Sequence, residues 1–559
     1  MTLLMYRLLP LLLILSALAP SVWGQTKTHA EQLLTDYQQA RAGLAAEPVK
    51  CGFPALAALH AERTKNPDWQ PQLRAAFARP SLPQTYVTPD GRFKIHYTTT
   101  GFDAVNPAST NTAGVPDFIY EAGLAAQRAY SLLVDELGMR PHANDNGSDG
   151  PEFDFYVLDL GNLYGETILE FSSGSGPSYI RIDNDYGSNF YTRGLEGLRV
   201  TVAHEYFHAV QLNYFFRDVD IFFFELSATW FEDVAYDDIN DYYQYLRTWF
   251  RNPDLPLNST TNFHQYGSCI WLHYLAKKLD PALVRLIWDQ IEYKPAVFAM
   301  QGVLDSGIYP ITFAQAIQEF SSWNYFTRYR ADADLFYEEG EAYPVVAIAA
   351  TQKTSSDTTI ASSLEPLAAH YYQFVRQGRS MQIYLHVDAD PGRWAVTAIS
   401  GSPSAGYDVM KDQGLAAVNL PALLREDTVT VAITNVGAPP SANQSPSYDY
   451  QLQIKYGVPQ DLPSVLENPR PNPFRIGEGA VLVFPYRLAE RERVHATIYR
   501  EDGKVVREFN LGSRGAGFHS DLTWNGTDGS GERVSSGVYF MRLRAGDLLE
   551  TTKVVVIAH

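Results

Sequence analysis

The stretch VTVAHEYFHAVQ, residues 200–211, contains two histidines four positions apart, with a glutamate directly after the first. On a helix, residues at this spacing lie on one face a turn apart, so the imidazoles of His204 and His208 can bind one metal ion. Glu205 lies beside that face, where a carboxylate can accept a proton from a metal-held water. The alternative is a buried helix whose histidines are hydrogen-bonded within the core. A third ligand elsewhere in the chain would favour the metal site.

A candidate for that ligand follows in FFFELSATWFEDVAY, residues 222–236. Glu225 comes seventeen positions after His208, which leaves room for a loop and a second helix packed on the first. Catalytic zinc uses three protein ligands and one open position, and two histidines with a glutamate are a known set. Glu232, two helical turns after Glu225, can accept a hydrogen bond from the outer nitrogen of a ligating imidazole. The reverse assignment, with Glu232 as ligand and Glu225 as accessory, stays open, although the shorter spacing favours Glu225.

This combination resembles the gluzincins, the HExxH-plus-glutamate zinc metallopeptidases that include thermolysin and aminopeptidase N. It is more similar still to a set of uncharacterised secreted bacterial proteins regarded as metallopeptidases, through FKIHYTTTG, GVPDFIYEAG and YGSCIWLHYL. The resemblance covers about residues 90–340. It implies a zincin-like fold with one catalytic zinc ion. The residues carried over are the zinc ligands His204, His208 and Glu225, the general base Glu205 and the supporting carboxylate of Glu232.

Two departures from the aminopeptidases limit what this resemblance implies. Leu226 stands where they have a glycine after the ligand, and the chain has no GxMEN-type element to hold a free amine. Exopeptidase activity therefore does not carry over, and an endopeptidase is expected. The family's transition-state tyrosine has its nearest match in Tyr266, with a spacing that differs by one residue. Tyr266 is thus a candidate hydrogen-bond donor to the oxyanion, the alternative being a packing role at a helix start.

The pattern along the chain predicts a multidomain α+β protein. Short alternating strands separated by Gly, Pro, Ser and Asn replace helix-length apolar periods near residue 345. We expect a zincin-like catalytic domain followed by two all-β domains of the sandwich or immunoglobulin-like type. The predicted segments are a signal peptide (1–24), a helical leader or pro-region (25–90), the zincin-like domain (91–340), a β-sandwich (345–457) and a second all-β domain (463–559).

The last of these segments resembles the FlgD-type immunoglobulin-like domain and the related C-terminal sorting domain of type IX secretion. The elements WNGTDGSG, SSGVYF and TTKVVV carry the similarity. It implies a transport or attachment module that works with secretion or cell-surface machinery and has no chemistry of its own. The flagellar role of the FlgD proteins does not transfer, because nothing upstream resembles a hook protein.

Charge and the N-terminus restrict the location and the partners. The formal charge of −19 argues against nucleic-acid or anionic-membrane binding, since both need a basic surface. Arg7, an apolar run and a small-residue exit before Gln25 are typical of a secretory signal peptide, and no later segment reaches transmembrane length. We expect export to the cell surface or the medium. The partner is then a peptide or protein substrate.

Two further features leave alternatives open. Cys51 and Cys269 are the only cysteines, and they could form a disulfide or remain as buried thiols. Cys51 could also cap the metal in a latent form, because thiolate is a good zinc ligand. Calcium could bind NDNGSDG (Asp145, Gly147, Asp149) or NTAGVPD (Asn111, Asp117), although both lack a full run of oxygen ligands and a closing glutamate.

The sequence therefore predicts a secreted zinc endopeptidase that hydrolyses peptide bonds, with Glu205 as general base. The rival hypothesis is a non-catalytic cell-surface or matrix adhesion protein in which the zincin lobe is a relic and the β-domains bind. The intact Glu205 speaks against a relic, since a dead site has no need of the base.

Overall fold

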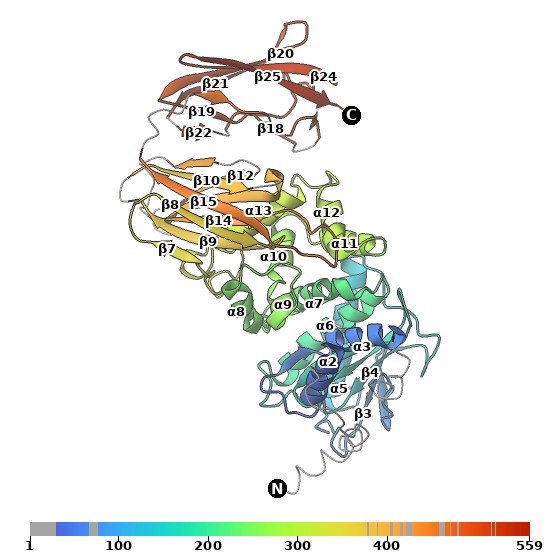
Figure 1. Ribbon diagram of the computed structural model, residues 1–559. Coiled ribbons are helices and arrows are strands. Elements are labelled where there is room, and N and C mark those ends of the chain that lie inside the picture. Colours follow the sequence, from blue (N-terminus) through green and yellow to red (C-terminus); the bar gives the residue numbers. More distant parts are fainter. Residues whose placement is uncertain are drawn as a thin grey trace. The chain divides into compact units, whose positions relative to one another are not determined.

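The structure of the chain is a computed structural model, shown in Figure 1. Its described residues form two compact units, one made of the chain up to Arg251 with Leu257–Met300, the other of Asn252–Pro256 with Gln301 onward. This division lies inside residues 91–340, which the sequence analysis groups as one domain. The predicted signal peptide, 1–24, lies outside the described residues. These are 29–65, 76–376, 379–387, 390–402, 406–413, 417–420, 428–457, 464–469, 471–477, 480–515, 517–519 and 521–558.

The first unit is built on a six-stranded mixed sheet with the strand order β1-β5-β6-β4-β3-β2. Strands β1 and β5, β4 and β6, and β3 and β4 pair in parallel, while β5 with β6 and β2 with β3 are antiparallel. Every residue of β4, β5 and β6 is buried, as expected for strands covered on both faces. The strands are β1 (Val49–Cys51), β2 (Gln84–Val87), β3 (Phe93–Tyr97), β4 (Phe153–Val157), β5 (Leu163–Leu169) and β6 (Ser178–Ile182).

Alternate residues of β5 contact helices on opposite faces of the sheet. Thr167 donates a hydrogen bond to Glu205 of α6 (Gly194–Leu212), whereas Glu166 forms an ion pair with Arg41 of α2 (His29–Arg41). Gly165 is required for the first contact, because an added Cβ would lie 2.8 Å from the Glu205 Cγ. The helix that carries the HExxH motif is thereby held directly against β5.

Several elements predicted around the motif are confirmed by the structure. The sequence patterns predict strands in RFKIHYTT and FDFYVLDL, and the structure has β3 and β4 there. The amphipathic stretch between them, IYEAGLAAQRAYSLLVDELGM, predicts a long helix, which is α5 (Asp117–Tyr130), continued by a π-helical turn, Ser131–Glu136. Strands β5 and β6 were not anticipated. The N-terminal segment is helical, as predicted, in α2 and α3 (Phe53–Lys65), but between these helices it also supplies strand β1.

Helix α7 (Ile221–Ala235) follows α6 after a short connection and packs against it. Fifteen of the nineteen residues of α6 are buried, consistent with a helix that is apolar on most sides. Further helices complete the first unit, and the last of them, α12, continues beyond Met300, where this unit ends. These helices are α8 (Tyr243–Arg251), α9 (His264–Gly267), α10 (Ile270–Lys278), α11 (Leu283–Ile291) and α12 (Ala296–Leu304).

The second unit begins with helix α13 (Phe313–Trp323) and continues as β-sheets. A five-stranded sheet, β12-β11-β14-β9-β7, and a four-stranded sheet, β13-β10-β15-β8, share one apolar core. Helix α13 contacts the five-stranded sheet, where Gln318 Nε2 donates to the Val396 carbonyl. The strands are β7 (Ala350–Gln352), β8 (Thr358–Leu364), β9 (Ala369–Val375), β10 (Met381–Val387), β11 (Trp394–Ser402), β12 (Gly406–Gln413), β13 (Ala417–Leu420), β14 (Thr428–Asn435) and β15 (Tyr448–Tyr456).

The C-terminal strands form a separate β-structure with its own core around Trp524. Its main sheet has the order β17-β25-β24-β20-β21, and two smaller sheets have the orders β16-β19-β22 and β18-β23. The strands are β16 (Val465–Leu466), β17 (Phe474–Arg475), β18 (Leu482–Val483), β19 (Tyr486–Leu488), β20 (Glu492–Arg500), β21 (Val505–Arg514), β22 (Gly517–His519), β23 (Thr523–Trp524), β24 (Gly537–Ala545) and β25 (Leu548–Ile557). The architecture is therefore mixed α/β in the N-terminal half and mainly β in the C-terminal half.

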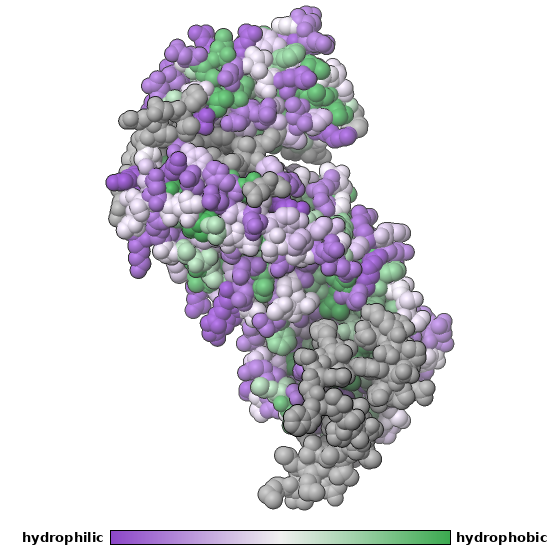
Figure 2. Space-filling view, viewed as in Figure 1, coloured by the Kyte–Doolittle hydropathy of each residue, from purple (hydrophilic) through white to green (hydrophobic). Residues whose placement is uncertain are grey.

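The surface agrees with the acidic, polar composition. Hydrophilic residues predominate on the face shown in Figure 2, with hydrophobic residues in small groups between them. Across the part of the chain that the structure describes, none of the helices has the length and apolar character needed to cross a membrane.

Candidate metal centre

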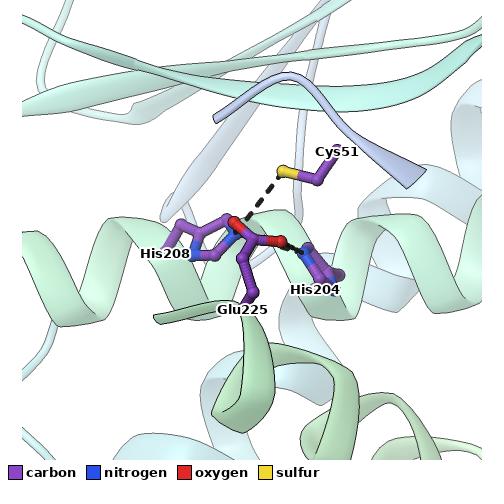
Figure 3. A group of neighbouring side chains, drawn as sticks. All are labelled: Cys51, His204, His208 and Glu225. Carbon is purple, nitrogen blue, oxygen red and sulfur yellow. Dashed lines mark hydrogen bonds and ion pairs between the residues drawn. The ribbon is translucent and has the colours of Figure 1, made fainter. Parts of the chain in front are cut away.

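Two helices bring the predicted metal ligands together. His204 and His208 lie on α6 and Glu225 lies on α7, and all three side chains are buried. Figure 3 shows Glu225 pointing from its helix toward both imidazoles. The histidines share one face because the helical repeat places residues four positions apart a turn from each other. Packing of the two helices supplies the rest of the arrangement.

Hydrogen bonds to the outer nitrogens orient both imidazole rings. His204 Nδ1 lies 2.7 Å from Glu232 Oε1, and His208 Nδ1 lies 2.7 Å from Gln211 Oε1. The amide of Gln211 is oriented in turn, because its Nε2 donates to the Phe224 carbonyl at 3.1 Å. Each Nδ1 therefore donates a hydrogen bond, and each Nε2 faces the centre of the site, where it can offer a lone pair to a metal once it has lost its proton.

The inward atoms form a tight cluster. The two Nε2 atoms are 3.1 Å apart, Glu225 Oε2 is 3.3 Å from His204 Nε2, and Glu225 Oε1 is 3.2 Å from His208 Nε2. Zinc held tetrahedrally at about 2.0–2.1 Å from nitrogen and oxygen ligands would separate those ligands by roughly 3.3 Å. The observed spacings agree with that value within about 0.2 Å.

The polar groups of this cluster also fit a cation. Both Glu225 carboxylate oxygens are buried, and each lies at ion-pair distance from an imidazole Nε2. A buried carboxylate is costly unless a positive charge compensates it. Two imidazole nitrogens and a carboxylate are a donor set suited to zinc, so His204, His208 and Glu225 fit the ion that the sequence implies.

The pKa values report the strong coupling of these groups without metal. Burial alone would lower the pKa of His204, but the Glu225 and Glu232 carboxylates raise it to about 9. Burial alone would raise the pKa of Glu225, but the two imidazoles lower it to about 2. Because imidazole must lose a proton before it binds a metal, a metal ion at this cluster would compete with protons.

Glu205 lies beside this cluster, on the sheet side of α6. Its Oε2 accepts a hydrogen bond from the Thr167 hydroxyl at 2.7 Å. Burial raises the pKa of Glu205, although the imidazoles and hydrogen bonds from Cys51 and Thr167 oppose this shift. A buried carboxylate with a raised pKa, next to three metal-type donors, is suited to accept and return a proton.

Tyr266, the candidate oxyanion donor, also lies at the site. It is buried in the short helix α9, and its ring centroid is 6.4 Å from that of His204. Burial and the nearby Glu225 carboxylate raise the pKa of the Tyr266 hydroxyl well above its usual range, so it remains a donor at neutral pH. The structure thus brings all six predicted site residues together.

The sequence did not reveal four residues that support the site, namely Gln211, Thr167, Lys50 and its partner Asp241. Gln211 stands three positions after His208, a helical spacing that could have revealed it. Thr167 lies on the unanticipated strand β5, with no local signal. Lys50 donates to Glu232 Oε2 at 2.6 Å and to Asp241 Oδ2 at 2.5 Å, and its side chain is buried. Because Lys50 and Glu232 are 182 positions apart, no spacing rule could have paired them.

The cysteines are free rather than bonded. Both Cys51 and Cys269 are buried thiols, and Cys51 Sγ lies 3.5 Å from His208 Nε2. Burial, with Glu205 and Glu225 close by, raises the pKa of the Cys51 thiol well above its usual range without metal.

The two loops considered for calcium have partners of their own. Asp117 accepts hydrogen bonds from the backbone N–H groups of Thr110 at 2.8 Å and Asn111 at 3.2 Å. Asp145 pairs with Arg79 at 2.8 Å, and Asp149 pairs with Lys94 at 3.3 Å. These carboxylates therefore bridge turns and basic side chains within the chain itself.

Comparison with known protein families identifies only the C-terminal region. Residues 477–547 match the model of the FlgD Ig-like domain, in agreement with the expected immunoglobulin-like domain at this end. A search of curated protein sequences finds no match.

Solved structures offer only weak likenesses. PliG of Aeromonas hydrophila, a periplasmic inhibitor of g-type lysozyme, is 12% identical with a TM-score of 0.15, covering 20% of this chain and 96% of that one. Dimeric latent PorU from Porphyromonas gingivalis is 12% identical with a TM-score of 0.16, covering 38% and 19%. The adhesin domain of Epf from Streptococcus pyogenes is 9% identical with a TM-score of 0.13, covering 36% and 77%. Similarity at this level carries no argument about function.

Proposed function

We propose that this chain is a secreted zinc endopeptidase with a zincin-like catalytic lobe. The observation that carries the proposal is the buried cluster of His204, His208 and Glu225, with Glu205 beside it. A structural role for two histidines would not require a buried glutamate aimed at the inward nitrogens of both rings. It would also not require a second buried carboxylate at the edge of the cluster. Both are needed for metal-assisted hydrolysis.

His204, His208 and Glu225 would hold the metal, and a zinc ion there would supply Lewis-acid polarisation for peptide hydrolysis. Glu205 takes up a proton from the attacking water at its carboxylate and returns it to the leaving amine. The Thr167 hydroxyl keeps this carboxylate turned toward the cluster. Tyr266 donates a hydrogen bond to the developing oxyanion. Glu232 and Gln211 hold the two imidazole rings in place.

The C-terminal region is proposed to attach or export the enzyme, since FlgD-like and type IX sorting-like domains are modules without chemistry. Export by the predicted signal peptide and action on protein substrates outside the cell belong to the same proposal. The acidic composition, with a formal charge of −19, supports a protein substrate over a nucleic acid.

Metal analysis of the purified chain tests the proposal directly. We expect one zinc ion per chain in the wild type and less than stoichiometric zinc in His204→Ala or His208→Ala, since each substitution removes a direct imidazole ligand. Casein digestion that stops with a chelator and returns with zinc would support the peptidase. A chain without stoichiometric metal, or with full zinc occupancy in both histidine variants, would refute the assignment and favour the adhesion protein.

A further inference from the structure

Strand β1 places a fourth metal-type donor in the cluster. Cys51 Sγ lies 3.5 Å from His208 Nε2, and one donor atom from each of Cys51, His204, His208 and Glu225 lies within 4.8 Å of all the others. Figure 3 shows the thiol pointing from the N-terminal segment toward the imidazoles and the carboxylate. The thiol is not isolated, because it belongs to the same buried group of donor atoms as the two imidazoles and the Glu225 carboxylate.

The position of the sulfur fits a closed tetrahedron. Zinc at about 2.3 Å from sulfur and about 2.0–2.1 Å from nitrogen would separate those two ligands by roughly 3.6 Å. A catalytic zinc site has three protein ligands and an open position, whereas four protein ligands close the site. We propose that Cys51 is the fourth metal ligand and holds the proposed peptidase in a latent state. The latent state rests on the proposed peptidase function, whereas the four-ligand site does not.

The residue before Cys51 anchors the segment. The buried Lys50 ammonium lies between Glu232 and Asp241, with the Tyr164 ring 5.3 Å away. Burial alone would lower the pKa of Lys50, but Asp241 and Glu232 raise it, so the amine stays charged. Glu232 also accepts the hydrogen bond from His204 Nδ1. The anchor of the segment and the support of a metal ligand are therefore the same carboxylate.

The backbone of the segment covers the strand that a substrate would use. Strand β1 pairs in parallel with β5, with Val49 opposite Leu163 and Cys51 opposite Gly165. Without β1, β5 would be the free edge of the sheet, where an extended peptide can add as a further strand. Glu205, the proposed base, packs against Gly165 of β5. The residue paired with Gly165 on the neighbouring strand is Cys51.

The residues after Cys51 are fitted closely to the same surface. A Cβ on Gly52 would lie 2.8 Å from Glu166 Oε2 and 2.9 Å from the Glu166 Cβ, so only glycine allows this approach. The Phe53 ring stacks on that of His208, with centroids 4.5 Å apart and planes at 22°. Residues 49–53 therefore occupy the space beside β5 and His208.

Cobalt substitution tests the fourth ligand without any assay of activity. A thiolate bound to Co²⁺ gives an intense near-ultraviolet charge-transfer band, which nitrogen and oxygen ligands do not give. We expect the band in the Co²⁺-loaded wild type and in Cys269→Ala, which removes the other buried thiol. We expect Cys51→Ala to lose the band and still bind Co²⁺ through three ligands. Absence of the band in the wild type, or its persistence in Cys51→Ala, overturns the inference.

Casein digestion then tests latency. With its metal retained, Cys51→Ala should cleave at least about tenfold faster than the wild type, because the fourth position is open, whereas Cys269→Ala should not change. Loss of metal from Cys51→Ala would show that the thiol is a required structural ligand and would overturn latency. Equal cleavage by wild type and Cys51→Ala without the cobalt band would leave the peptidase standing and refute the role of Cys51. The band without cleavage by either protein would keep the four-ligand site and refute the peptidase and latency together.

Discussion

Glutamine substitutions at Glu225 and Glu232 separate the two carboxylates by the atoms they face. Glu225 faces both Nε2 atoms at 3.2 and 3.3 Å, whereas Glu232 contacts only His204 Nδ1 at 2.7 Å and the Lys50 ammonium. Glutamine keeps the size of either side chain but removes its charge. Glu225→Gln therefore removes a direct ligand, and Glu232→Gln leaves a neutral acceptor for the imidazole.

The expected magnitudes differ because the two roles differ. Structural zinc sites with four ligands bind with roughly 10–16 kcal/mol, so one ligand contributes about 2.5–4 kcal/mol if the total is shared equally. At about 1.4 kcal/mol for each factor of ten, Glu225→Gln should weaken zinc binding by about 10²- to 10³-fold. Loss of an orienting partner costs about 10- to 100-fold, and Glu232→Gln keeps part of that interaction, so about tenfold is expected.

Competition with a chromophoric chelator at neutral pH measures both values. Glu196→Gln is the matched control, because Glu196 is an exposed acid on the same helix, and it should bind zinc as the wild type does. Thermal unfolding of each metal-free variant shows whether the fold is retained. Zinc binding that is weakened more in Glu232→Gln than in Glu225→Gln would reverse the two roles. Equal losses would mean that both carboxylates touch the metal.

Three further outcomes follow from the structure. Glu205→Gln should keep zinc and lower casein cleavage by about 10²- to 10⁴-fold when it is combined with Cys51→Ala and compared with Cys51→Ala alone. Unchanged cleavage would require another base. Gln211→Leu removes the acceptor for His208 Nδ1 and should weaken zinc by about tenfold in the same chelator competition, whereas wild-type affinity would show that this support is not needed. Burial lowers the pKa of His142 from 6.5 to about 4, so its contribution to stability is complete above about pH 6.5 and is lost as the pH falls toward 4. His142→Gln should therefore lose less unfolding free energy than the wild type between about pH 7 and 4, by up to about 3 kcal/mol in urea titrations, and equal losses would contradict the shift.

The part of the site that the sequence predicts is the part that local geometry determines. His204, Glu205 and His208 lie within five positions on one helix, where the repeat of the backbone decides which side chains share a face. Glu225 and Glu232 lie two turns apart on α7, so the same rule places them on one face of that helix without reference to tertiary contacts. The short connection between these helices makes their packing predictable as well.

The sheet could be predicted only in part. Strands β3 and β4 have clear β-branched and aromatic patterns, but in β5 the residues Gly165 and Glu166, which strands disfavour, precede Thr167 and weaken the pattern. Those three residues are explained by tertiary contacts. Gly165 admits α6, Thr167 binds Glu205, and Glu166 pairs with basic side chains from the other face. A strand shaped by its neighbours in this way carries little signal of its own.

The N-terminal segment shows the limit of local reasoning most clearly. Helices α2 and α3 are predictable from their composition, but the three residues between them, Val49–Cys51, acquire their meaning only by pairing with β5. Cys51 meets a histidine 157 positions away, and Lys50 meets a glutamate 182 positions away. Neither contact has a spacing rule, because a sheet edge accepts a strand from any part of the chain. Yet these two neighbours in sequence both contact the proposed metal centre. The Cys51 sulfur lies at the proposed ligand His208, and the Lys50 ammonium binds Glu232, which orients His204. A segment placed there only to complete the sheet would need neither a thiol nor a buried charge, so its side chains are better explained by the metal centre than by the fold.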